Sequence, residues 1–182
     1  MAGYVGAGSL SRPAKVLELR ETSAGTWEWV PTRTAWASIE LRSRTNLFSK
    51  VGVGARDAAI VVRRQRLTLH HALSWNGTHF FLTSIVSMGR NHLDVSAAVV
   101  TPTRCISEGV AFPGVLTEKY AGHTQEEPMS VNLLRLVLVV PKAIKLRPGC
   151  LVEARGANWE VLVPHELDEY KNEYEIGRTV DL

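Results

Sequence analysis

The residues of this sequence that could perform chemistry are six histidines, two cysteines and several runs of charged side chains. His70 and His71 are adjacent, and adjacent side chains of a β-strand point to opposite faces, so the pair cannot bind one metal ion together. We therefore expect no metal site and assign the histidines to the surface or the core. The histidines without partners at a metal-ligand spacing are His79, His92, His123 and His165.

No set of residues combines a nucleophile, a base and an orienting group. Cys105 and Cys150 are far apart and lack partners at a metal spacing, so we expect both to be reduced structural residues. The segment Gly6-Ala7-Gly8 has no preceding strand and no following helix, which argues against a phosphate-binding loop. The sequence therefore predicts a protein that is not an enzyme, with no catalytic residues and no cofactor.

An acidic stretch near the C-terminus lacks the glycine and the ligand spacing of a calcium loop. We expect a solvated hairpin between Val163 and Tyr174 instead. The stretch contains Glu166, Asp168, Glu169, Tyr170, Glu173, Tyr174 and Glu175.

A basic cluster, Arg63, Arg64 and Arg66, directly follows the apolar run Ile60–Val62. It is either a strand end in water or a group of phosphate contacts, since arginine neutralises phosphate without reading sequence. No basic and aromatic residues alternate here as in proteins that stack exposed bases. Sequence-specific DNA binding is therefore not expected.

The composition is that of an ordinary globular protein, with 45% apolar and 21% charged residues. Apolar runs such as Leu136–Val140 are too short to span a membrane, and residues 1–10 do not resemble a signal peptide. The charge is unevenly distributed along the sequence. Residues 1–102 include 12 lysines and arginines and 6 acidic residues, whereas residues 103–182 include 9 lysines and arginines and 12 acidic residues. This is either scatter or a sign that the two ends meet different partners.

Alternating, β-branched and aromatic runs predict an all-β fold, since no stretch sustains a helical period. The turns between the runs contain Gly, Asn or Ser, as hairpins require. The predicted strands lie within residues 16–20, 36–41, 58–62, 80–86, 131–140, 151–154 and 159–163.

The sequence also contains an internal repeat. Residues 72–82 align with 151–161, which matches a strand, a turn glycine and an aromatic residue three positions later. Three further segments align at similar spacings: 36–40 with 112–116, 60–62 with 138–140, and 93–95 with 174–176. The alternative is that there is no repeat, because any two β segments can be aligned when each has a glycine in a turn.

The repeat predicts two copies of one small β unit, with long inter-strand loops, in domains 1–102 and 103–182. Gly77 and Gly156 should occupy equivalent hairpins, and Phe80 and Trp159 equivalent core sites. In the first copy we expect Trp36 and Ile39 to anchor the core.

The order of pieces in the first hundred residues resembles the head-tail joining (head-closure, stopper or connector) proteins of tailed bacteriophages. An opening strand (15–20) is followed by a glycine turn with tryptophans (25–29) and by Thr34-Ala35-Trp36-Ala37-Ser38-Ile39-Glu40. A long polar loop, a strand with a basic end (60–66) and a final hairpin pair around Gly77 complete the pattern. The resemblance covers about half of the chain; the second half departs from the pattern. Members of this family are small β-barrels, so the resemblance and the repeat together imply an all-β fold of two tandem small β-barrels of similar topology, 1–102 and a diverged 103–182.

The resemblance implies a structural protein of the virion neck, made in the cytoplasm of the host bacterium. Such proteins form a homo-oligomeric ring, here a hexamer or dodecamer, that seals packaged DNA and docks the tail. The implied partners are a portal or adaptor ring, a tail terminator or tail tube, and DNA bound non-specifically, but no membrane. Alternatives are an adaptor, a tail terminator, or a nucleic-acid-binding barrel protein without enzymatic activity.

The loop 42–57 is predicted to make the assembly contacts, because it is longer than a hairpin turn and is basic and apolar. The shorter, acidic segment 118–128 would suit contact with it. The candidates for an interface or a channel are Arg42, Arg44, Leu47, Phe48, Lys50, Arg56, Arg63, Arg64 and Arg66.

Overall fold

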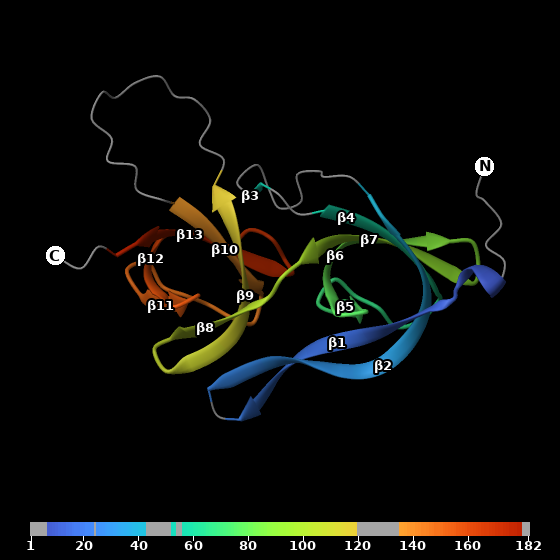
Figure 1. Cartoon of the computed structure of the whole chain (residues 1–182), viewed down its shortest axis with the longest axis horizontal. Coiled ribbons are helices and arrows are strands. Elements are labelled where there is room, and N and C mark those ends of the chain that lie inside the picture. Colours follow the sequence, from blue (N-terminus) through green and yellow to red (C-terminus); the bar gives the residue numbers. More distant parts are fainter. Residues whose placement is uncertain (1–6, 24, 43–51, 54–55, 120–134, 180–182) are drawn as a thin grey trace, which may run out of the picture. The chain divides into compact units, whose positions relative to one another are not determined.

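The computed structural model describes residues 7–23, 25–42, 52–53, 56–119 and 135–179. These ranges are almost entirely β-structure, with one 3-10 helix, η1 (Ala7–Ser9), and no α-helix (Figure 1). The predicted all-β class is confirmed. The strands are β1 (Arg12–Ser23), β2 (Thr26–Leu41), β3 (Gly52–Val53), β4 (Arg56–Arg63), β5 (Ala72–Trp75), β6 (Thr78–Met88), β7 (His92–Val100), β8 (Thr103–Ser107), β9 (Val110–Lys119), β10 (Arg135–Pro141), β11 (Leu151–Ala154), β12 (Ala157–His165) and β13 (Lys171–Arg178).

Hydrogen bonds join these strands into one 13-stranded sheet, and contacts divide the chain into two compact units. The tip of the β1–β2 hairpin belongs to the second unit, where the Ala111 N–H donates to the Gly25 carbonyl at 2.7 Å. The first unit comprises Met1–Arg20, Trp29–Leu47 and Ala55–Thr101, and the second comprises Glu21–Glu28, Phe48–Gly54 and Pro102–Leu182.

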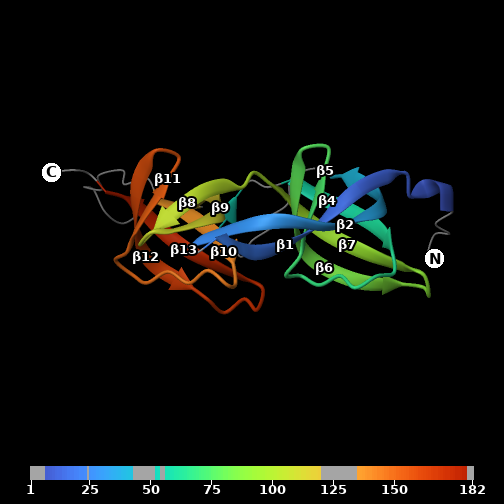
Figure 2. The ribbon, with the colours of Figure 1, turned by 90° about the horizontal axis from the view of Figure 1, so that it is seen from below.

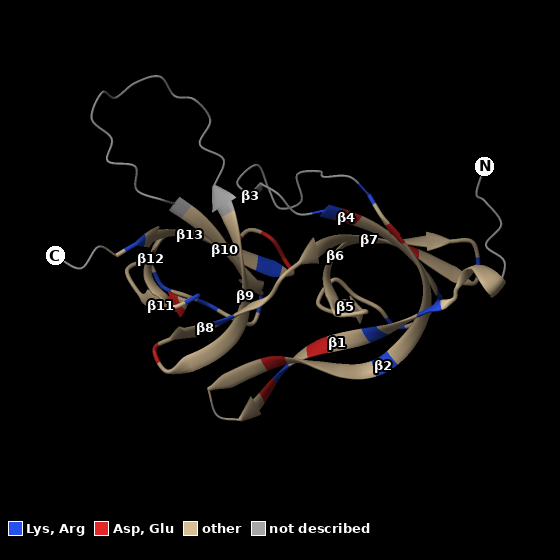
Figure 3. Cartoon of the chain, viewed as in Figure 1, with Lys and Arg blue, Asp and Glu red and all other residues tan. Residues whose placement is uncertain are grey.

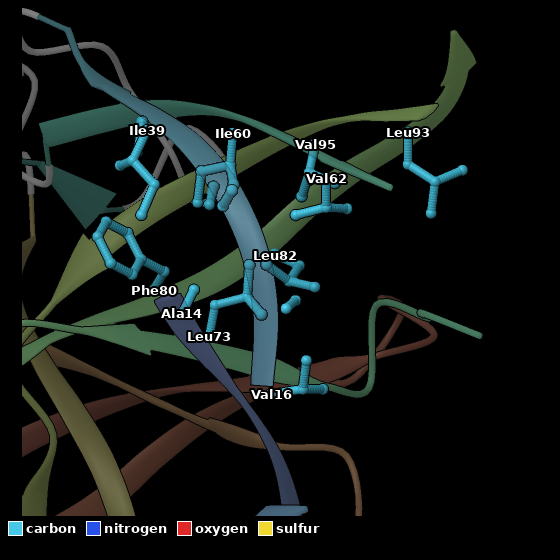
Figure 4. Packing of buried hydrophobic residues seen from close by; sticks show 14 residues of the cluster. Ala14, Val16, Ile39, Ile60, Val62, Leu73, Phe80, Leu82, Leu93 and Val95 are labelled. Atoms are coloured by element: carbon cyan, nitrogen blue, oxygen red, sulfur yellow. The ribbon is translucent and has the colours of Figure 1, made fainter. Parts of the chain in front are cut away.

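In the first unit the strand order is β1-β5-β6-β7-β4-β2, and an additional β1–β2 pairing leads back to the start. The core forms because alternate residues of each strand are apolar and share one face. On β4, Ile60 and Val62 are fully buried while Arg63 at the strand end is exposed. Phe80 and Leu73 pair across β5 and β6 and point into the same cluster (Figure 4).

The second unit repeats this order strand for strand. It runs β8-β11-β12-β13-β10-β9, and a β9–β8 pairing again leads back to the start (Figure 2). Its core includes Phe112, Leu138 and Tyr174, and the Trp159 indole donates to the Ala154 carbonyl at 3.2 Å. Both units thus bury their own set of large apolar side chains.

The predicted hairpin equivalence is confirmed. Asn76 and Gly77 have φ values of 50° and 76°, and Arg155 and Gly156 have 52° and 71°. Positive φ at both central residues is what a two-residue type I′ hairpin requires. Each turn is followed by the predicted buried aromatic residue, Phe80 at 0% exposure and Trp159 at 6%.

A register irregularity also recurs at the same place in both units. On β6 it falls between Leu82 and Ser84, and on β12 between Val161 and Val163. These positions coincide in the alignment of residues 72–82 with 151–161 when it is continued by two residues. A β-bulge re-aims the strand locally, so its recurrence extends the similarity to detailed geometry.

The prediction that Trp36 anchors the core is wrong: the side chain is 56% exposed, while Ile39 is 4% exposed as expected. Ala35, Ala37 and Ile39 occupy the inward face of β2, so the residues between them point outward. The alignment of Trp36 with Phe112 was displaced by one residue, which exchanges the two faces of a strand.

The correct alignment follows from pairing. Ile39 pairs with Ile60 on β4, as Leu116 pairs with Leu138 on β10, so Phe112 corresponds to Ala35. Likewise Val95, rather than Leu93, corresponds to Tyr174, because these two residues pair with Ile60 and Leu138. That second displacement is two residues and leaves the buried face unchanged.

Candidate functional site: an arginine corner and an acidic turn

Five arginines gather at one end of β4 in the first unit, and we call them the arginine corner. β4 pairs with β7, so the turn that precedes β7 lies beside the end of β4. The arginine corner comprises Arg33 on β2, Arg63 at the end of β4, Arg64 and Arg66 just beyond it, and Arg90 in the β6–β7 turn.

Hydrogen bonds hold the backbone of the arginine corner. The Arg64 N–H donates to the Asn91 carbonyl at 2.7 Å. The Arg33 guanidinium donates to the Gln65 side chain at 3.1 Å and to the Arg66 carbonyl. The side chains of Arg63, Arg64, Arg66 and Arg90 are exposed, and no ion pair joins any of the five arginines to a carboxylate among the described residues. The arginine corner is therefore a concentration of positive charge open to an anionic partner.

Exposed Trp36 borders the arginine corner. Ala37 pairs with Val62, so Trp36 lies across from Arg63 on the outer face, and Arg63 in turn pairs with His92 on β7. A large exposed indole next to guanidinium groups offers apolar contact and charge together.

The structure brings together only part of the predicted site. Arg63, Arg64 and Arg66 lie in the arginine corner, whereas exposed Arg56 begins β4 at its other end. Exposed Arg42 lies near Arg56, because its N–H donates to the Asp57 carbonyl at 2.7 Å. Arg44, Leu47, Phe48 and Lys50 lie outside the described residues.

The loop predicted over 42–57 is shorter than expected, because Arg56 and Asp57 belong to β4. Within it, β3 pairs with the end of β9, Gly52 with Lys119 and Val53 with Glu118. The remainder of the acidic segment 118–128 lies outside the described residues. The predicted contact between these two segments on neighbouring subunits stays a prediction.

Arg33, Arg90 and the exposure of Trp36 were missed from the sequence. Arg90 lies in a predicted turn next to a strand, but its place beside Arg63 and Arg64 can be predicted only when the pairing of β4 with β7 is known. Arg33 gives no local signal, because its contact with residues 65 and 66 depends on the folded arrangement.

The predicted hairpin between Val163 and Tyr174 is confirmed and its turn is exposed, but Glu173, Tyr174 and Glu175 of the acidic stretch are buried on β13, so that part is not solvated. The exposed turn forms a second notable surface. We call residues 166–170, between β12 and β13, the acidic turn; its Asp and Glu residues are coloured red in Figure 3. The Lys142 ammonium donates to the carbonyls of Glu166 and Asp168 at 2.8 and 2.6 Å. The Asp168 carboxylate accepts the N–H groups of Tyr170 and Lys171 at 2.7 and 2.8 Å.

The acidic turn is also tied to the core. The Tyr174 hydroxyl accepts the Leu146 N–H at 3.1 Å and donates to the Glu166 carboxylate at 2.8 Å. Burial and, to a smaller extent, the adjacent Glu166 carboxylate raise the pKa of Tyr174 to about 12, so the phenol keeps its proton. The result is a fixed turn from which the Leu167 side chain projects, 103% exposed.

The other chemical candidates have structural roles. The His71 imidazole contacts the Thr68 hydroxyl at 2.8 Å and lies 3.5 Å from the Glu18 carboxylate. Burial raises the pKa of the Cys105 thiol to about 11, which keeps it protonated and unreactive. No group of three potential metal ligands occurs among the described residues.

None of the helical segments in the described ranges is long and apolar enough to cross a bilayer. Comparison with known proteins finds no matching family model, no matching curated protein and no matching solved structure.

Proposed function

We propose that this chain is a structural neck protein of a tailed bacteriophage, a head-closure subunit that works by assembly. The observation that carries the proposal is the set of large apolar side chains exposed on both units. They lie among charged residues, as in the surface of a subunit that is covered on assembly. The set comprises Trp36, Leu41, Val86, Leu151, Leu162, Val163 and Leu167.

The order of strands in the first unit supports the proposal. The opening strand is β1, the tryptophan segments lie on β2, the basic strand end is that of β4, and Gly77 joins β5 to β6. These are the pieces on which the resemblance to head-tail joining proteins rests.

Each unit is proposed to be a small six-stranded barrel. The support is the pairing of β1 with β2 and of β8 with β9, which returns each strand order to its first strand. Closed sheets leave turns and outer faces for contact with partners. The domain that departs from the family pattern, 103–182, would then be a second, diverged barrel.

The proposed assembly is a ring of identical subunits in the virion neck, between a portal or adaptor ring and a tail terminator or tail tube. Cyclic symmetry lets one pair of surfaces serve every subunit contact. The arginine corner would then face a neighbouring subunit, an adjacent ring or the packaged DNA.

The test uses the purified full chain. Sedimentation and electron microscopy should show closed rings whose population rises with protein concentration. In the virus that encodes the chain, a nonsense mutation in its gene should yield heads that lose their DNA and carry no tail. A chain that stays monomeric at every concentration, or tailed infectious particles made without it, would overturn the proposal.

A nucleic-acid-binding protein is the second candidate, and the arginine corner is the observation that favours it. Such binding should weaken steeply as salt rises, because each phosphate contact releases counterions. Binding of duplex DNA by a monomeric chain, abolished by Arg63→Ser with Arg64→Ser and Arg66→Ser, would favour this candidate over the neck protein.

A further inference from the structure

We propose that the acidic turn of one copy of this chain docks on the arginine corner of a second copy. The inference rests on the proposed assembly and names the contact that would join its subunits. It goes beyond the predicted role of residues 42–57, because neither surface lies in that loop.

The two surfaces are the same corner of a duplicated fold. In the first unit the Arg64 N–H donates to the Asn91 carbonyl at 2.7 Å, and in the second the Lys142 N–H donates to the Tyr170 carbonyl at 3.1 Å. Both bonds tie the end of one strand to the turn that precedes the last strand of the unit. The side chains of Arg64 and Lys142 also make equivalent contacts, since each donates to backbone carbonyls of the facing turn. The Arg64 guanidinium donates to the Arg90 carbonyl, and the Lys142 ammonium donates to carbonyls of the acidic turn.

The charge of this corner differs between the units. Arg90 of the first unit corresponds to Glu169 of the second, since each precedes the residue that accepts the shared backbone bond. At and beyond the strand end, Arg63 and Arg66 correspond to Pro141 and Ile144, which carry no charge, while Arg64 and Lys142 are both cationic. The first corner is therefore strongly basic, whereas its counterpart carries the carboxylates of Glu166, Asp168 and Glu169 around Lys142, and two such surfaces attract when they belong to different copies.

The acidic turn has the features of an interface anchor. Leu167 is 103% exposed, although burial of its side chain would be favourable. The turn is already ordered by the bonds from Lys142, Tyr174 and its own Asp168. Docking would therefore cost little conformational entropy, which favours a tight contact.

The arginine corner offers the matching surface. Trp36, 56% exposed, presents an apolar ring beside Arg63. Leu167 would pack on this indole while the carboxylate of Glu169 meets the guanidinium groups. An apolar anchor surrounded by complementary charges is the usual anatomy of a protein interface.

A second copy fits better than nucleic acid, because the Leu167 turn supplies an apolar partner for Trp36 as well as the negative charge. The two surfaces differ, so the contact is heterologous and joins subunits head to tail. Such contacts produce a ring if the rotation closes.

The test uses two variants of the full chain, each with one surface disabled. The turn variant carries Leu167→Ser and Glu169→Ser, and the corner variant carries Arg63→Glu and Arg90→Glu. The substituted side chains make no hydrogen bond that holds the fold among the contacts described above. In sedimentation, each variant alone should self-associate at least about tenfold more weakly than the parent chain.

A mixture of the two variants gives the decisive result. The turn variant keeps a working corner and the corner variant keeps a working turn, so the mixture should form pairs of one copy of each and nothing larger. Matched controls carry Glu153→Ser with Glu160→Ser, or Arg104→Glu with Arg147→Glu. All four control side chains are exposed in the second unit, and both controls should assemble like the parent chain.

The outcomes separate this contact from the proposed function. If the parent forms rings and the turn variant forms them equally well, the docking is overturned while the assembly stands. If the mixture stays monomeric, the docking is overturned as well. If the parent is monomeric and only the corner variant loses DNA binding, nucleic acid occupies the corner, and both the docking and the assembly fail.

Discussion

At the residue scale, β2 places two large side chains, three positions apart, on opposite faces of the strand. Trp36 faces outward at 56% exposure, whereas Ile39 is buried at 4%. A sequence that places tryptophan in an alternating strand suggests a core anchor, yet the inward positions beside it are the small residues Ala35 and Ala37. The core has room for the side chains of facing strands, such as Phe80, because β2 contributes small ones here.

Trp36→Ala is therefore predicted to change the free energy of unfolding by less than about 1 kcal/mol. Phe80→Ala, at a fully buried site, should cost about 3 to 5 kcal/mol. Urea unfolding of both variants checks this under conditions where the chain is monomeric. A Trp36→Ala cost as large as that of Phe80→Ala would contradict the outward orientation.

His79 lies in an aromatic cluster of the first unit. Its ring centroid is 5.6 Å from that of Trp29 and 5.5 Å from that of Phe81. Burial lowers the pKa of His79 from 6.5 to about 4, because the charged form loses its hydration. Its Nε2 atom has no hydrogen-bond partner among the described residues.

A depressed histidine pKa means that the unfolded chain binds the proton more readily. The contribution to stability is present above pH 6.5 and is lost as the pH falls toward 4, by roughly 3 kcal/mol in total. His79→Phe should remove this part of the pH dependence. Urea unfolding from pH 7 to pH 4 measures it; equal slopes for parent and variant would show that another group is responsible.

At the element scale, β9 and β13 each contain a glycine where a side chain would meet a neighbour. A Cβ at Gly114 would lie 2.7 Å from Leu138 Cδ1 and 2.9 Å from Cys105 Sγ, both in the core. A Cβ at Gly177 would lie 3.0 Å from Leu162 Cδ1, whose side chain is 38% exposed and free to turn aside.

Gly114→Ala is predicted to destabilise the second unit by about 1 to 3 kcal/mol, because buried neighbours must shift. Gly177→Ala should cost less than about 1 kcal/mol, since an exposed side chain yields more easily. Thermal unfolding of the two variants compares them, and a larger cost at Gly177 would show that β13 is the more tightly enclosed strand.

The acidic turn depends on a cation from another element. Lys142→Met should remove the bonds to the Glu166 and Asp168 carbonyls while keeping the aliphatic stem. We expect faster hydrogen exchange at the amides of Tyr170 and Lys171 and weaker self-association, because the turn is less ordered before docking. Lys145→Met, at an exposed position just beyond the strand end, is the control. Unchanged exchange in Lys142→Met would mean that Asp168 and Tyr174 suffice to hold the turn.

Local patterns predicted the elements well, but not the sites. Asn76-Gly77 and Arg155-Gly156 identify their own hairpins, because positive φ is a local requirement. The choice of face on β2 could not be predicted, since Trp36 and Ile39 both suit a half-buried strand and one residue of displacement exchanges the faces. The arginine corner depends on the pairing of β4 with β7, which brings together residues 63 and 92. This pairing could not be predicted from the sequence of either segment alone.

At the scale of the whole molecule, the charge of the sequence is unevenly distributed, and the proposed contact between copies would depend on this. The net charge of +3 combines a basic first half with an acidic second half. Identical chains of uniform positive charge would repel one another, whereas chains with opposite charges on two surfaces attract in one orientation.

Self-association of the parent chain is therefore predicted to weaken as salt rises from about 0.05 to 0.5 M, because exposed charges are screened within a Debye length. The residual association at high salt should depend on Leu167 and Trp36, whose contact is apolar. Sedimentation equilibrium across this range checks the prediction. Association that strengthens with salt would indicate a contact dominated by the apolar side chains alone.

The irregularity shared by β6 and β12 bears on the ancestry of the chain. Two unrelated sheets of similar order have no reason to interrupt their register at the same step, between Leu82 and Ser84 and between Val161 and Val163. Bulges persist within families because they set local geometry. The shared strand order and the shared irregularity are what duplication and fusion of a gene for a single unit would produce. Such a duplication would supply a second corner in the same chain, and the proposed head-to-tail contact depends on two corners of unlike charge.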